Sequence, residues 1–172
     1  KSLGVKLEIK DEKGIAHCYM NIGVIFHTQG EYIRALDYYF KCLKIREKLD
    51  DQIGVAGIYN NIGAVYHYQD DFTTTTKYYN KSLQIALNSG SSARISFAYS
   101  NIGNVLFEKG DSAKKSYNFA LAEENYDSSL LYYKKSLGLK IESNSLSGIS
   151  KCYNNLGTVY FEKDFLDTAL NY

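Results

Sequence analysis

The sequence predicts an all-α protein, a right-handed α-solenoid of stacked antiparallel helix hairpins. Three observations lead to this prediction. The 172 residues include no proline, so no helix is interrupted by a residue that lacks a backbone donor. Two short strings recur along the chain in step with each other, which indicates an internal repeat. Within each repeat the apolar residues follow the spacing of amphipathic helices.

The repeat has a period of forty residues. The string N-I/L-G occurs four times, at intervals of 40, 40 and 54 residues, and the string K-S/C-L recurs at the same intervals. Because both markers shift together, the third unit carries fourteen extra residues. The markers lie at 21–23, 61–63, 101–103 and 155–157, and at 1–3, 41–43, 81–83 and 135–137.

The first helix of each unit carries an apolar stripe around the N-I/L-G string. In the first complete unit Tyr19, Ile22, Gly23 and Phe26 follow the i, i+3, i+4, i+7 spacing of one helix face. A glycine inside a helix costs about 1 kcal/mol relative to alanine. Its recurrence therefore indicates that a neighbouring helix backbone passes too close for a side chain. Later units repeat the stripe at Tyr59, Ile62, Gly63 and Tyr66, at Tyr99, Ile102, Gly103 and Leu106, and at Tyr153, Leu156, Gly157 and Tyr160.

A turn and a second helix complete each unit. The turns are predicted at residue types that tolerate the left-handed backbone ending a helix, namely Gly30, Asp70, Gly110 and Asp164. The second helix of the first complete unit carries its own stripe of Tyr32, Ala35, Leu36, Tyr39, Cys42 and Leu43. Small residues recur at one place in this helix, at Ser2, Cys42, Ser82 and Ser136. A hairpin cannot bury its apolar face alone, so the units must stack.

These residues resemble the tetratricopeptide repeat family in its forty-residue variety, which occurs in bacterial regulators and sensors and in polarity adaptors. The family pattern of aromatic, Leu-Gly, Tyr, Ala, aromatic and Ala is similar to Tyr19, Ile22–Gly23, Phe26, Ala35, Tyr39 and Cys42. The resemblance covers nearly the whole chain, although Thr75 and Ser129 replace the second-helix alanine. It implies a superhelix whose first helices line a concave groove that binds a protein or peptide segment.

We expect residues 1–172 to form a single array that is cut from a longer chain. Residues 1–10 match the end of a second helix, and residues 164–172 match the start of one. The compartment is left open, with the cytoplasm slightly favoured. The predicted parts are 1–13, the end of a preceding repeat; 14–53 and 54–93, two complete repeats; 94–147, a repeat with an insertion at 111–124; and 148–172, an incomplete repeat.

A second stripe on each first helix lies roughly 130–140° from the apolar one, at about 100° per residue. The resemblance implies that this stripe is the concave face, where carboxamides could pair a peptide backbone and aromatic rings could take its side chains. The candidate ligand-binding residues are His17, Met20, His27, Asn60, His67, Tyr68, Phe97, Asn104, Phe107, Lys151, Asn154 and Phe161. Asparagines that recur in every unit are instead expected to hydrogen-bond between units, at Asn21, Asn61, Asn101 and Asn155.

All three histidines of the chain lie on this stripe, and His27 and His67 are equivalent residues of adjacent units. They either form a pH-dependent anion site or a metal pair, or they are solvated surface residues. Two nitrogens without a third ligand make a poor metal site, so we expect no metal and no cofactor. The cysteines lack metal-ligand spacing, and Cys18, Cys42 and Cys152 are predicted to be buried packing residues.

The insertion at 111–124 follows the turn expected at Gly110. Asp111 is a good N-cap type, and fourteen residues advance a helix by nearly whole turns. We predict that the insertion lengthens the second helix by about four turns, roughly 21 Å, and that this helix projects. A loop or a separate short helix is the alternative. Unless the helix folds back over the adjacent hairpin, it presents a surface for a partner or for self-association at Tyr117, Phe119 and Leu121.

The expected function is that of a protein- or peptide-binding scaffold and not of an enzyme. The chain contains no phosphate loop, nucleophile motif or HExxH spacing. Its net charge of +1 gives no basic excess for nucleic acid, and no apolar run is long enough to span a membrane. The alternative is a ligand-sensing regulatory input domain of a larger bacterial signalling protein; a rigid spacer is a third hypothesis.

Overall fold

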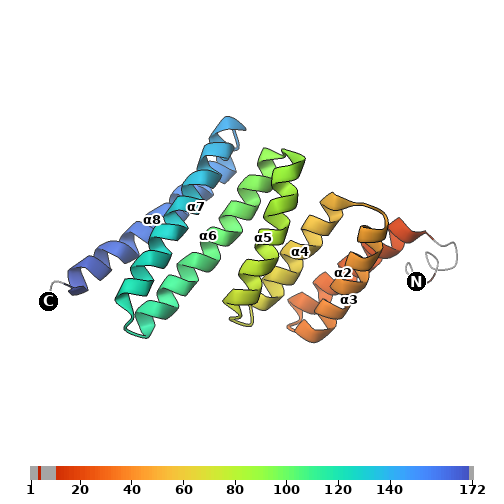
Figure 1. Ribbon diagram of the computed structural model, residues 1–172, viewed down its shortest axis with the longest axis horizontal. Coiled ribbons are helices and arrows are strands. Elements are labelled where there is room, and N and C mark those ends of the chain that lie inside the picture. The colour runs from red at the N-terminus through yellow and green to blue at the C-terminus, as the bar shows by residue number, and fades with distance from the viewer. Residues whose placement is uncertain (1–3, 5–10, 171–172) are drawn as a thin grey trace. The chain divides into compact units, whose positions relative to one another are not determined.

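The computed structural model describes residue 4 and residues 11–170, and in this part of the chain it contains seven α-helices and no strand (Figure 1). The all-α solenoid class predicted from the sequence is confirmed. The chain divides into two compact units, 1–85 and 86–172. The helix end predicted at 1–10, including Ser2, lies outside the described residues, apart from Gly4.

The first unit is built from helices that follow one another through short turns. They are α2 (Glu12–Thr28), α3 (Tyr32–Lys48), α4 (Gln52–His67) and most of α5 (Phe72–Ser89). Helices α2 and α3 pack as a hairpin, and α4 packs against α3. The turns predicted at Gly30 and Asp70 are confirmed, because both residues have a positive φ, of 76° and 58°.

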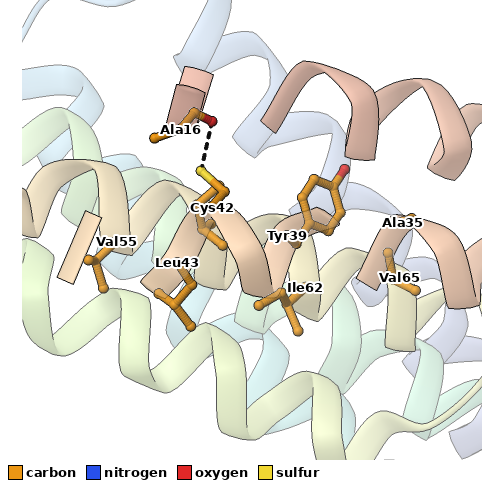
Figure 2. Packing of buried hydrophobic residues seen from close by; sticks show 9 residues of the cluster. Ala16, Ala35, Tyr39, Cys42, Leu43, Val55, Ile62 and Val65 are labelled. Carbon is orange, nitrogen blue, oxygen red and sulfur yellow. Dashed lines mark hydrogen bonds between the residues drawn. The ribbon is translucent and has the colours of Figure 1, made fainter. Parts of the chain in front are cut away.

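Buried side chains from α2, α3 and α4 form the core of the first unit. Figure 2 shows this cluster, which consists of Ala16, Ala35, Tyr39, Cys42, Leu43, Val55, Ile58, Ile62 and Val65. The Cys42 thiol donates a hydrogen bond to the carbonyl oxygen of Ala16 at 3.0 Å. The recurring small position of the second helix is buried at Cys42, Ser82 and Ser136. Cys152 is also buried as predicted, whereas Cys18 is only half-buried.

The glycine of the N-I-G string lies against a tyrosine ring of the second helix. A Cβ atom added at Gly23 would lie 2.5 Å from Cε1 of Tyr39, far inside van der Waals contact. The string therefore needs glycine because of a neighbouring ring, and the prediction of a close helix backbone is wrong. The same pairing recurs between Gly63 and Tyr79 and between Gly103 and Tyr133.

The second unit contains α6 (Ser92–Lys115), α7 (Phe119–Glu142) and α8 (Leu146–Leu170). Helices α6 and α7 form a hairpin, and α8 packs against α7 (Figure 1). Both hairpin helices have 24 residues, whereas those of the first unit have 16 to 18. The insertion thus lengthens both helices by about two turns. The prediction that it extends the second helix alone is wrong, and the turn lies at Tyr117, where φ is 59°.

Gly110 and Asp111, predicted as a turn and an N-cap, lie inside α6. Gly110 is buried, and a Cβ atom there would lie 2.5 Å from Cε1 of Tyr126. This pair repeats the packing of Gly103 on Tyr133, seven residues later on α6 and seven residues earlier on the antiparallel α7. Asp111 accepts a hydrogen bond from the Tyr126 hydroxyl at 2.6 Å. The extra residues therefore add one more layer of the same glycine–tyrosine packing.

Helix α8 also differs from its predicted length. It continues through Asp164, where the sequence predicts a turn, and ends at Leu170. The second helix expected to start within 164–172 is therefore absent from the described residues up to Leu170. The N-cap of the preceding helix α7 is Asn118, whose Oδ1 accepts a hydrogen bond from the Leu121 N–H at 3.2 Å.

Because several tyrosines are buried, we predict that the folded protein loses stability at high pH. Burial raises the pKa of Tyr39 to about 12, and burial also raises the pKa of Tyr126 and Tyr133. In the unfolded chain a tyrosine ionises near pH 10. Between about pH 10 and 12 the folded chain therefore retains protons that the unfolded chain has lost, and stability falls as pH rises.

We expect the free energy of unfolding in urea to be steady near pH 9 and then to fall by about 1.4 kcal/mol per pH unit from Tyr39 alone. Tyr39→Phe removes this one ionising phenol. The free energy of unfolding of the variant is therefore expected to fall by about 1.4 kcal/mol less per pH unit. Urea titrations of both proteins between about pH 9 and 12 measure the difference. Identical pH profiles would show that the Tyr39 phenol does not ionise more easily on unfolding.

Candidate functional site

In the first unit the candidate residues lie on α2 and α4. His17 and Tyr68 are exposed, whereas the other four are half-buried: Met20, His27, Asn60 and His67. The Oδ1 atom of Asn60 is buried and has no hydrogen-bond partner among the described residues. A buried acceptor without a partner costs free energy, so Asn60 is the carboxamide of this unit best prepared to accept from a ligand.

An aromatic cluster lies at the ends of α2 and α4. The ring centroid of His27 lies 5.1 Å from that of Tyr68, at 73°, and 6.0 Å from that of Tyr32. Burial lowers the pKa of His27, which disfavours the imidazolium at neutral pH and with it an anion site there. His67 instead packs against Phe72, with ring centroids 6.2 Å apart. The described residues include no group of three or more His, Cys, Asp or Glu side chains placed to hold a metal ion.

In the second unit a pocket of about 140 Å³ opens between α6 and α8. Two of its residues, Asn104 and Phe107, are candidates from the sequence, and both are half-buried. Tyr133, on α7, also lines this pocket, and its side chain is buried. The full lining is Asn104, Phe107, Glu108, Tyr133, Asn155 and Thr158, and these six residues are defined as the α6–α8 pocket.

A hydrogen-bond chain fixes the side chains of this pocket. The Tyr133 hydroxyl donates to Oδ1 of Asn104 at 2.7 Å, and Nδ2 of Asn155 donates to the same oxygen at 3.4 Å. The Thr158 hydroxyl donates to the backbone carbonyl of Asn154 at 3.0 Å. The contact from Asn155 to Asn104 joins two first helices, as expected for the recurring asparagine, whereas the equivalent Asn21 is exposed.

Four residues of the pocket are not among the candidates predicted from the sequence: Glu108, Tyr133, Asn155 and Thr158. Asn155 belongs instead to the recurring asparagines, which are expected to hydrogen-bond between units. A comparison of equivalent positions in the four units could have indicated the partner of Asn104 in this pocket. Asn104 stands where the other units have Val24, Ala64 and Thr158. An acceptor that occurs in one unit only indicates a local partner, here the Tyr133 phenol.

The other candidates of the second unit are exposed. Phe97 on α6 and Phe161 on α8 are 54% and 69% exposed, high values for phenylalanine. Lys151 and Asn154 are exposed on α8 as well. They provide apolar and polar contact area on the two helices that carry the α6–α8 pocket.

The tip of the α6–α7 hairpin carries the apolar residues predicted as a partner surface. Tyr117 is 83% exposed and Leu121 is 44% exposed. Phe119 is half-buried, and its ring meets Tyr117 edge to face at 6.3 Å. Self-association through this tip stays a prediction. A second hollow, of about 520 Å³, lies beside the tip and is lined by Asp111, Lys114, Lys115, Tyr117 and Glu162.

Two comparisons concern sequence. The family model described as Tetratricopeptide repeat matches residues 15–49, and a second model with the same description matches residues 54–114. No curated protein matches the chain. Among the described residues, no helix combines the length and apolar character needed to cross a membrane.

Solved structures give a comparison of the fold. The chain is similar to the crystal structure of BtubC (BKLC) from P. vanneervenii, with a TM-score of 0.54 and 14% identity over 89% of this chain and 66% of that chain, slightly less than two thirds of its length. It is also similar to the N-terminal domain of stress-induced protein-1 (STI-1) from C. elegans, with a TM-score of 0.55 and 17% identity over 84% of this chain and 96% of that chain. At these identities the likeness concerns the fold alone.

Proposed function

The chain belongs to the tetratricopeptide repeat proteins, and from this premise we propose that it binds a peptide or protein segment along the first helices of its hairpins. Repeats of this family are typically interaction scaffolds and not catalysts. The observation that carries the proposal lies in the second unit. There the candidate face combines the α6–α8 pocket with the exposed rings of Phe97 and Phe161.

The chemistry of this face suits an extended segment. Exposed aromatic rings on a folded chain bury apolar area when a partner covers them, and such rings dominate many binding interfaces. The carboxamides of Asn154 and Asn155 each offer a donor and an acceptor, as a peptide backbone requires. A pocket beside these groups can take one side chain of the segment. The exposed rings thus supply affinity, and the carboxamides and the pocket fix the register of the bound segment.

The test is binding of peptides selected from a random library on the full chain. Phe97→Ala and Phe161→Ala are each expected to raise the Kd of a selected peptide by about tenfold, because each truncation removes about 1.4 kcal/mol of contact. Isothermal titration calorimetry measures the Kd. The matched control is Phe40→Ala on α3, since Phe40 is the same residue type and is 41% exposed on a second helix.

The control is expected to leave the Kd within about twofold. Peptides that bind equally well to all three variants would place the binding surface elsewhere. A library that yields no binding peptide would count against the function itself. Far-ultraviolet circular dichroism of each variant checks that the helices remain folded.

A further inference from the structure

We propose that one face of α8 binds an amphipathic helix of a partner protein, and that this helix carries two adjacent aromatic residues. The face is formed by Tyr153, Gly157 and Tyr160 and is defined as the α8 stripe. It is the apolar stripe around the last N-I/L-G string and not the face of the candidate ligand-binding residues, so the inference does not rest on the proposed function. The elements that cover the same stripe in the other units define the occupant.

The α8 stripe is exposed, whereas the equivalent stripes are covered. Gly157 is exposed, and no side chain or neighbouring backbone of the described residues lies within 4 Å of a Cβ atom added there. Tyr153 is 58% exposed and Tyr160 is 45% exposed. The exposure of Tyr160 already allows for Lys134 of α7, whose Nζ lies 5.6 Å from the ring centroid. The three equivalent glycines are buried, at Gly23, Gly63 and Gly103.

In the first unit two adjacent rings of α5 fill such a stripe. Tyr79 lies on Gly63, where an added Cβ atom would be 2.6 Å from Cδ1 of the ring. The ring of Tyr78 packs against Tyr59 and Tyr66, with centroids 5.9 Å and 5.8 Å away. The α8 stripe has tyrosines at the positions of Tyr59 and Tyr66 and glycine at that of Gly63. It therefore offers a slot for two adjacent rings, whose burial contributes strongly to binding.

A small residue of the second helix makes a third contact, three positions after the second tyrosine. The Cys42 thiol donates to the carbonyl oxygen of Ala16 at 3.0 Å. The Ser136 hydroxyl donates to the carbonyl oxygen of Ser96 at 2.7 Å. The equivalent of Ala16 and Ser96 on α8 is Ser150, which is exposed. The occupant is therefore an antiparallel helix with the pattern aromatic, aromatic, x, x, serine or cysteine.

A second copy of this chain does not supply such a helix. The pattern occurs three times within residues 1–172, with the tyrosine pairs 38–39, 78–79 and 132–133. The second tyrosine of each pair is buried on a glycine of its own hairpin, so a second copy would have to open a hairpin to present it. The exposed pair Tyr160–Phe161 has Asp164 at the place of the small residue, and burying a carboxylate is unfavourable. These features favour a partner protein as the source.

The experiment titrates the 15N-labelled full chain with a synthetic peptide of sequence 72–89, which carries the pattern at Tyr78, Tyr79 and Ser82. Saturable shifts of the amide signals of Tyr153 and Gly157 are expected, and isothermal titration calorimetry measures the Kd. The same peptide with Tyr79→Ala lacks the ring that covers the glycine, so its Kd is expected to be at least about tenfold higher. Gly157→Ala in the chain places a methyl group where that ring would lie. It is expected to raise the Kd of the unchanged peptide by at least about tenfold.

The matched control is Gly138→Ala on α7. It adds the same methyl group at another exposed helix glycine where an added Cβ atom has no side chain or neighbouring backbone of the described residues within 4 Å. This control is expected to leave the Kd within about twofold. Because alanine has the better helix propensity, both variants are expected to unfold at urea concentrations no lower than the unchanged chain does.

Peptide binding that survives Gly157→Ala overturns the proposal, and so does the absence of any shift at Gly157. A chain that sediments as a dimer, and that Gly157→Ala converts to a monomer, assigns the α8 stripe to a second copy and also overturns the proposal. Peptides that need Phe97 and Phe161 are expected to bind the Gly157→Ala chain as tightly as the unchanged chain. Loss of this inference therefore leaves the proposed function standing.

Discussion

Replacing Tyr126 by alanine is expected to lower the free energy of unfolding by about 3–5 kcal/mol, as for other buried aromatic residues. Tyr126 is 0% exposed, and its ring fills the space beside Gly110. Its hydroxyl donates to Oδ1 of Asp111 at 2.6 Å. Alanine leaves a cavity between α6 and α7 and removes that hydrogen bond. Urea unfolding of the full chain, followed by circular dichroism, measures the loss.

Tyr117→Ala is the matched control for this substitution. It removes the same residue type from the same hairpin, but Tyr117 is 83% exposed. We expect its effect to stay within about 0.5 kcal/mol, as for most surface substitutions. Similar losses at the two positions would show that the added layer contributes no more to stability than the exposed tip does.

Replacing Gly110 by alanine is expected to lower the free energy of unfolding by up to about 2 kcal/mol. An extra methyl group in a filled core costs about 1–3 kcal/mol, and the better helix propensity of alanine returns about 1 kcal/mol. The new Cβ atom would lie 2.5 Å from Cε1 of Tyr126. The ring cannot easily move aside, because its hydroxyl is held by Asp111.

Gly138→Ala in α7 is expected to act in the opposite direction. No atom of the described residues lies within 4 Å of a Cβ added there, and Gly138 is exposed. Helix propensity alone then decides, and we expect a gain of about 0.5–1 kcal/mol. The two variants, compared by urea unfolding, change the same residue type in one hairpin. A Gly110→Ala protein as stable as Gly138→Ala would contradict the packing described for Tyr126.

The repeat spacing was sufficient to predict most helices of the chain. Apolar side chains at helical intervals fix which face of each segment is buried, and this information is local. Gly30 and Asp70 end helices as predicted, since both residue types tolerate a positive φ. Gly110 looks the same in sequence, but it lies inside α6. Residue type alone does not distinguish a glycine that ends a helix from a glycine that makes room for a ring.

The place of the insertion depended on contacts between helices. In an antiparallel hairpin that keeps Gly103 on Tyr133, added helical residues are covered on their apolar face when both helices lengthen, since each new turn of one helix then packs on a new turn of the other. Gly110 and Tyr126 supply that layer. The sequence indicated that fourteen added residues suit a helix, but it did not show that they are divided between two helices.

The candidate site, too, was predicted from the sequence only in part. The stripe on the first helices, with Asn104 and Phe107 among its members, follows from helical periodicity and from the resemblance to the repeat family. The sequence by itself thus determined the class of fold, the repeat and the face on which each candidate lies. Only the tertiary structure decided that Tyr133 and Asn155 share a pocket with them, and which lone pairs remain for a ligand. The reason is physical: periodicity orients a side chain on its own helix, whereas its hydrogen-bond partner comes from another helix that packing alone brings within reach.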